Sequence, residues 1–259
     1  MCLLVIAWEV HPRYRLVVAA NRDEFHKRAA EPLALWPPPD NFLAGRDRQA
    51  GGTWLAIDGA RRFGVVTNFR ELQRPAPGAP SRGNLIPDYL RAEMGAEEYL
   101  RRLEANAANY SGFNLLLTDQ DSLWYASNRA PSFRRRLSPG IYGLSNEFLD
   151  TPWPKLRRVR RQFEAWLSER GDDQAALFSI LADRTQAGVN DHLPQTGLSH
   201  EWEQLLSSPF ICNADYGTRC STTLLLEPAG ALRLTERRFD SDGRASGDTD
   251  IRLSAGEWP

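Results

Sequence analysis

The order of strand-like and helical segments constrains the fold of this chain most. Short runs dense in Val, Leu and Ile come in neighbouring pairs, and helical patterns separate these pairs without a regular β-α-β alternation. Parallel strands need long crossover connections, whereas antiparallel neighbours can be joined by short turns. The order therefore favours an α+β domain layered on antiparallel sheets.

Apolar periodicity and turn residues place the individual segments. We expect strands at residues 2–9, 15–20, 51–57, 63–68, 113–117, 123–126, 140–144, 218–226 and 231–239. We expect helices at residues 85–90, 96–108, 153–167, 172–182 and 200–206. Ser81 stands where a helix N-cap is wanted, and the proline-rich residues 32–39 and residues 70–80 are expected to be loops.

The chain is expected to form a single domain spanning residues 1–259. A chain of 259 residues can bury about three quarters of its extended surface on folding. Its 42% hydrophobic and 25% charged residues are typical of a globular protein. The sequence contains no internal repeat, no low-complexity segment and no linker long enough to divide it.

The charge pattern argues against a nucleic-acid partner. The net charge is −1, so no overall field attracts nucleic acid or anionic membranes. The arginines of residues 157–161 fit the solvated face of the expected helix, because no aromatic residues interleave with them. Of the 32 lysines and arginines only Lys27 and Lys155 are lysine. We attribute this skew to genome base composition and not to a phosphate site.

Cysteine and histidine usage indicates a cytoplasmic protein that requires no metal or other cofactor. The three cysteines are widely spaced and lack a C-x-x-C pattern, which argues against a disulfide framework and a zinc site. The four histidines lack metal-binding spacing. The N-terminal apolar run is too short to span a membrane and is soon followed by charged residues.

Cys2 is the first candidate for chemistry. It follows the initiator Met1, and a small second residue usually permits removal of the methionine, which would give Cys2 a free α-amine. An α-amine titrates near ~7.7–8.0 and a thiol near ~8.5, so the two groups can exchange a proton at neutral pH. Cys2 is thus a candidate nucleophile with its own base. The alternative is a small apolar residue that begins a buried strand.

A cluster of four polar residues, Asn21-Arg22-Asp23-Glu24, directly follows the second expected strand. In a hairpin of this length, the end of the second strand returns beside the start of the first, so the cluster should neighbour Cys2. An arginine lowers the pKa of a nearby thiol, and an aspartate can hold an ammonium group or orient an amine. The alternative is an exposed charged loop at a strand end.

These residues belong to a set of motifs that resembles the NRDE family, also called transport and Golgi organisation protein 2. The set comprises Cys2, Asn21-Arg22-Asp23-Glu24, Gly51-Gly52-Thr53-Trp54, Thr67-Asn68, Ser81-Arg82-Gly83, Leu144-Ser145-Asn146, Tyr216-Gly217-Thr218-Arg219 and Ser221-Thr222. The resemblance implies an N-terminal nucleophile hydrolase fold, a four-layer α-β-β-α sandwich of two antiparallel sheets. It also implies links to haem trafficking and to lipid or acyl-CoA balance.

The pattern is more distantly similar to the cholylglycine hydrolase and penicillin V acylase family, which hydrolyses linear amides with an N-terminal cysteine. This similarity implies a catalytic set, namely Cys2, Arg22, Asp23, Asn68, Asn146 and Arg219. In this set Asn68 would donate to an oxyanion, Asn146 would fix the α-amine or the substrate carbonyl, and Arg219 would hold charge near the thiolate. Both asparagines are alternatively ordinary turn or strand-end residues.

One departure from the acylase pattern affects the arginine and the acid. In the acylases two residues separate them, whereas Arg22 and Asp23 are adjacent here and would face opposite sides of a continuing strand. Either Asn21 with Asp23 or Arg22 with Glu24 would then share a side. The residues alone do not decide which pair faces Cys2.

Two functions follow as hypotheses. The first is an amidohydrolase that cleaves a linear amide through a thioester on Cys2. The second is a binding protein of the same fold without turnover, with haem or a hydrophobic molecule as its ligand. No haem-attachment motif is present.

The nucleophile hypothesis requires processing of the N-terminus. We expect the intact mass of the purified protein to be lower than that of the full sequence by one methionine residue, because Cys2 is small. Electrospray mass spectrometry measures this directly. Catalytically active protein that retains Met1 would contradict the role of Cys2.

Overall fold

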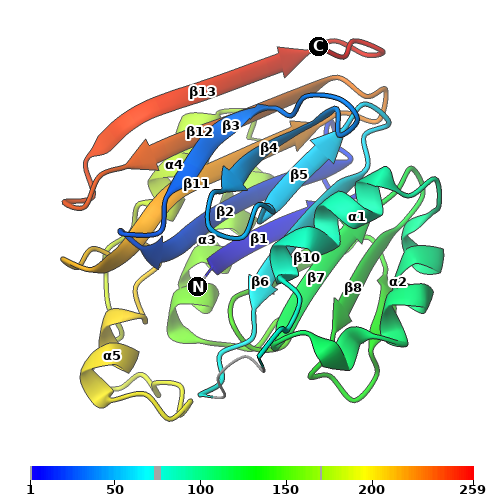
Figure 1. The fold of residues 1–259 in the computed structure, drawn as a ribbon. Coiled ribbons are helices and arrows are strands. Elements are labelled where there is room, and N and C mark those ends of the chain that lie inside the picture. Colours follow the sequence, from blue (N-terminus) through cyan, green and yellow to red (C-terminus); the bar gives the residue numbers. More distant parts are fainter. Residues whose placement is uncertain (1, 73–76, 170) are drawn as a thin grey trace. The chain divides into compact units, whose positions relative to one another are not determined.

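Two antiparallel sheets with helices make up the computed structural model of the chain, which describes residues 2–72, 77–169 and 171–259 (Figure 1). The chain divides into two compact units, and each unit contains one sheet. The prediction of two antiparallel sheets with helices is therefore confirmed. That both units form a single domain stays a prediction.

The first unit comprises Met1–Lys27, Pro139–Ser145 and Leu149–Gly256. Its six strands lie in the order β10-β1-β2-β11-β12-β13, and each pairs antiparallel with its neighbours. The strands are β1 (Cys2–Trp8), β2 (Leu16–Phe25), β10 (Gly140–Leu144), β11 (Tyr216–Leu226), β12 (Leu232–Phe239) and β13 (Ala245–Leu253). The helices are α3 (Pro154–Ser168), α4 (Gln174–Leu181) and α5 (His200–Leu205).

Helices α3 and α4 cover one face of this sheet. Helix α3 packs on β1 and β10, and α4 packs on β2 and β11. Leu3, Val5 and Ala7 of β1 belong to the same buried cluster as Leu156 and Val159 of α3. Because strand side chains alternate between faces, Cys2 belongs to the face of the sheet opposite these helices.

The second unit comprises Arg28–Ser138, Asn146–Phe148 and Glu257–Pro259. Its seven strands are neighbours in chain order, from β3 to β9. They are β3 (Ala30–Leu35), β4 (Phe42–Asp47), β5 (Leu55–Asp58), β6 (Phe63–Asn68), β7 (Phe113–Thr118), β8 (Leu123–Ser127) and β9 (Arg134–Leu137). Its helices are α1 (Leu85–Arg91) and α2 (Ala96–Glu104), and short 3-10 turns occupy Arg82–Asn84 and Ala107–Asn109.

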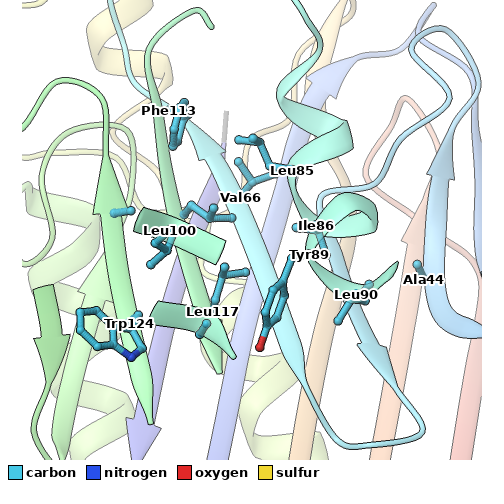
Figure 2. Close-up of a cluster of buried hydrophobic side chains, with 14 of the residues drawn as sticks. Ala44, Val66, Leu85, Ile86, Tyr89, Leu90, Leu100, Phe113, Leu117 and Trp124 are labelled. Carbon is cyan, nitrogen blue, oxygen red and sulfur yellow. The ribbon is translucent and has the colours of Figure 1, made fainter. Parts of the chain in front are cut away.

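The core of the second unit lies between its sheet and its two helices. Figure 2 shows Ile86 and Tyr89 of α1 and Leu100 of α2 beside Val66 and Leu117 of the sheet. The Tyr89 hydroxyl donates to the carbonyl of Thr118 at 2.9 Å, which satisfies its polar tip in an apolar setting. Helix α1 packs on β5 and β6, and α2 packs on β8.

Most expected elements are present, and the differences have physical reasons. Strand β3 overlaps the proline-rich region expected to be a loop, and it is an edge strand, where the missing N–H of Pro32 is tolerated. Strands β9 and β13 were not expected because they carry charged or small residues, and β4 was not expected because its apolar run is only Phe42-Leu43-Ala44. The expected helix at 96–108 ends at Glu104 and is followed by a 3-10 turn. Residues 73–76 of the expected loop lie outside the described residues.

Helices in the described ranges are all too short or too polar to cross a membrane.

Two glycines of the family motifs approach each other closely. A Cβ on Gly52 would lie 2.2 Å from the carbonyl oxygen of Gly83, and the Thr53 N–H donates to that same oxygen at 2.9 Å. Gly52 is therefore required by backbone packing between the segment before β5 and the turn before α1.

Gly52→Ala is expected to destabilise the protein by roughly 1–3 kcal/mol, because two backbone segments must move apart. Urea unfolding followed by circular dichroism measures the loss. Gly188→Ala is the matched control, since a Cβ there meets only the Asp191 carboxylate at 3.6 Å. Equal stability of the two variants would contradict the packing role of Gly52.

Candidate active site

The register of three strands places Cys2 beside the polar cluster. Cys2 pairs with Arg22 of β2, and Arg22 in turn pairs with Cys220 of β11. The Ser145 hydroxyl donates to the Cys2 carbonyl at 3.1 Å and so fixes the start of β1. The expected proximity of Cys2 to the cluster is present in the structure, and β2 continues to Phe25 without ending in an exposed loop.

The alternation along β2 separates the four polar residues into two pairs. Asn21 belongs to the helix-covered face, because its side-chain amide donates to the carbonyls of Leu181 and Pro209 at 2.9 Å each. Asp23 shares this face, and Arg22 and Glu24 share the face of Cys2. The question left open by the sequence is thus answered by the register: Arg22 is the cluster residue directly opposite Cys2.

The environment of Cys2 has opposing effects on its thiol. Burial raises the pKa of the Cys2 thiol, and the charge of Asp23 acts in the same direction. The Arg22 guanidinium and the backbone N–H of Asp23 act in the opposite direction. Burial has the larger effect, so the pKa of the Cys2 thiol lies above its ordinary value.

Asp23 is a buried carboxylate with several polar neighbours. Its Oδ1 accepts a hydrogen bond from the Thr218 hydroxyl at 2.7 Å, and its backbone carbonyl accepts from the Tyr216 hydroxyl at 3.0 Å. Burial raises the pKa of Asp23 above its ordinary value, and the Lys155 ammonium, the Thr218 hydrogen bond and Arg22 reduce this rise without reversing it. Lys155 is itself only 1% exposed.

Arg219 lies at an irregularity of the sheet. The pairing of β2 with β11 shifts between Thr218 and Cys220, so Arg219 is an extra residue in a β-bulge. Its guanidinium donates to the carbonyls of Phe25 and His26 at 3.1 and 2.9 Å. Burial and the charge of Arg22 both lower the pKa of Arg219. Arg219 therefore lies near Arg22 and holds the end of β2.

Asn68 and Asn146 are joined in the second unit. The Nδ2 group of Asn146 donates to the backbone carbonyl and to the Oδ1 of Asn68, at 3.0 Å each. The Asn146 carbonyl accepts from the Arg70 N–H at 2.7 Å, and Asn146 is completely buried. Because Oδ1 of Asn68 accepts, its Nδ2 group is the one oriented to donate elsewhere.

The structure adds polar residues that sequence reasoning did not assign. Cys220 and Glu236 lie on the Cys2 face, where burial and the charge of Glu236 raise the pKa of the Cys220 thiol. Glu236 also pairs with Arg238. The sequence marks Lys155 only by the rarity of lysine in this chain. Cys220 and Glu236 carry no such mark, since only strand register brings them to this face.

Other motif residues have structural roles. Ser81 is an N-cap whose hydroxyl accepts from the Gly83 N–H, as expected. The Ser221 hydroxyl donates to Oδ1 of Asn21 at 2.6 Å. Among residues 2–72, 77–169 and 171–259, no group of three or more His, Cys, Asp or Glu side chains is arranged to hold a metal ion.

The two sheets and their helices define an N-terminal nucleophile hydrolase-like fold. The structure is similar to the C2A mutant of conjugated bile acid hydrolase from Clostridium perfringens, with a TM-score of 0.50 and 7% identity. The match covers 98% of this chain and 92% of that chain. At this identity the similarity concerns the fold alone.

The family model "Transport and Golgi organisation 2" matches residues 1–241, and the chain belongs to this family. The chain is 33% identical over 259 residues to the Transport and Golgi organization protein 2 homolog of Bos taurus, covering 92% of both chains. It is 28% identical over 261 residues to Transport and Golgi organization protein 2 of Drosophila melanogaster, covering 91% of both. The resemblance inferred from the motifs is confirmed.

Asn21→Ala is expected to destabilise the protein by about 3 kcal/mol or more, because three buried groups lose a partner and each such loss costs roughly 1–3 kcal/mol. The Leu181 and Pro209 carbonyls and the Ser221 hydroxyl would all lose a partner. Urea unfolding tests this. Glu24→Gln, in the same motif, retains an acceptor for the Phe25 N–H and is expected to change stability by less than ~0.5 kcal/mol. A stable Asn21→Ala protein would contradict the anchoring role.

Proposed function

We propose that this chain is a cytoplasmic N-terminal cysteine amidohydrolase that cleaves a linear amide of a small molecule through a thioester on Cys2. The observation that carries the proposal is the pairing of Cys2 with Arg22, which gives a thiol at the second position a buried cation on its own face. Buried charges are costly, and they concentrate where chemistry requires them.

The proposed reaction begins after removal of Met1. The α-amine of Cys2 takes the thiol proton, and Sγ attacks the amide carbonyl carbon to form a tetrahedral oxyanion. The C–N bond then breaks, and the leaving amine receives the proton from the α-ammonium. Water, deprotonated by the same α-amine, attacks the thioester, which releases the carboxylic acid and restores the thiol.

The surrounding residues have distinct proposed roles. Arg22 favours the thiolate by its charge, and the Asp23 backbone N–H hydrogen-bonds to the sulfur. The acylase resemblance implies Asn68 as the oxyanion donor, and within the second unit Asn146 orients its amide so that Nδ2 is free to donate. Asn146 is then a positioning residue, and Arg219 stabilises the end of β2 that carries Arg22.

The alternative is a binding protein without turnover, for which haem or another hydrophobic molecule would be cargo. Its supporting observation is that Asp23 faces away from Cys2, unlike the pair expected from the acylase pattern. Titration with haemin, followed by absorbance, tests this alternative. Haemin binding that is unchanged in Cys2→Ala, together with no amide cleavage, would favour it.

The enzyme proposal is tested by acylation of Cys2. A β-lactone probe is expected to label the N-terminal peptide of the processed protein and to leave Cys2→Ala unlabelled at this peptide. A variant with lysine inserted after Met1 keeps its methionine and should react at least ~10²-fold more slowly, because it lacks the α-amine base. Peptide mass spectrometry gives the rates.

The exposed Cys212 provides the control, since Cys212→Ala should leave labelling of Cys2 unchanged. Equal labelling of the processed and methionine-retaining proteins would contradict the proposed base.

A further inference from the structure

We propose that Lys155 is a positioning residue of the Cys2 site, whose ammonium pairs with the Asp23 carboxyl group on the helix-covered face of the sheet. The inference rests on the proposed function for its catalytic meaning. The pairing itself is a property of the folded protein and can be tested without a substrate.

Lys155 is placed at the site by helix α3. It is the second residue of this helix, and α3 packs on β1, the strand that begins with Cys2. Trp153 and Leu156 on either side of Lys155 belong to the same buried cluster as Leu3. A lysine that is 1% exposed within apolar packing needs a compensating charge, because an isolated buried ammonium is very costly.

Asp23 is the carboxylate that supplies this charge. It lies on the helix-covered face of the sheet, is 1% exposed, and experiences the Lys155 ammonium as the strongest influence lowering its pKa. The other groups that act on Asp23 are the Thr218 hydroxyl and the Arg22 guanidinium, and the charge of Asp23 acts in turn on the Cys2 thiol. Lys155 is the only one of these named groups contributed by a helix.

The choice of lysine is itself informative. In a chain that otherwise uses arginine almost throughout, one of its two lysines occupies this buried position. A guanidinium is broad and planar, whereas an ammonium is a compact point charge that can approach a single carboxylate from beneath a sheet. The other lysine, Lys27, is exposed and lies over the ring of Phe25.

The pair has a direct consequence for Cys2. An ionised Asp23 raises the pKa of the Cys2 thiol, and burial alone would favour a protonated Asp23. Without Lys155, the pKa of Asp23 would therefore be higher still. The thiol would ionise more easily below the pKa of Asp23 and less easily above it.

The test measures alkylation of Cys2 by iodoacetamide between pH 5 and pH 10, relative to the exposed Cys212 in the same molecule. We expect one inflection in the wild type, two in Lys155→Met, and one again in Lys155→Met combined with Asp23→Asn. Lys27→Met should match the wild type. A Lys155→Met profile with a single inflection would overturn the proposal.

Unfolding measurements keep the test decisive if Lys155→Met is too unstable to assay. The double variant removes both charges, so it should be more stable in urea than Lys155→Met alone. Destabilisation of the double variant by the sum of the two single losses would overturn the pairing.

The experiments distinguish a failure of the Lys155–Asp23 pairing from a failure of the proposed amidohydrolase function. Two inflections in Lys155→Met without acylation of Cys2 by the β-lactone would support the pair and reject the amidohydrolase. Acylation of Cys2 with no second inflection would support the enzyme and reject the role of Lys155.

Discussion

Antiparallel pairing of β2 with β1 and β11 is the constraint on which the candidate site depends. It aligns Cys2, Arg22 and Cys220 across three strands of one sheet, although the third lies almost two hundred residues further along the chain. The pleat then decides which side chains share a face. This pairing places Arg22 opposite Cys2 and places Asn21 and Asp23 on the helix-covered face. There Asn21 joins α4 to the sheet, and Asp23 interacts with Lys155.

The two faces of β2 bury different sets of polar groups. On the helix side, Asn21 replaces water for two buried carbonyls, which contributes to stability. On the Cys2 side, Arg22, Cys220 and Glu236 are buried polar or ionisable groups whose desolvation opposes folding. A sheet that retains such groups on one face carries a cost that apolar packing against α3 and α4 offsets on the other.

The fold could be predicted from the sequence wherever the spacing of apolar residues matched their burial in the structure. The hairpin of β1 and β2 and the amphipathic face of α3 were read correctly because their apolar periodicity reflects real burial. Strand β13 was missed because its alternation consists of charged and small residues at a sheet edge. Position 155 could not be assigned, since the partner of a buried lysine depends on how a helix packs on a distant strand.

At the Arg219 bulge, the needs of strand pairing and the contacts of the side chain can be told apart. Thr218 pairs with Asp23 and Cys220 pairs with Arg22, so the two pairs would remain in phase if β11 were one residue shorter. Strand pairing alone therefore does not require a residue at position 219. A deletion of position 219 would keep the flanking strand pairs in register and would remove the bulge together with the guanidinium that reaches Phe25 and His26. The contacts of the Arg219 side chain therefore explain why β11 contains this extra residue.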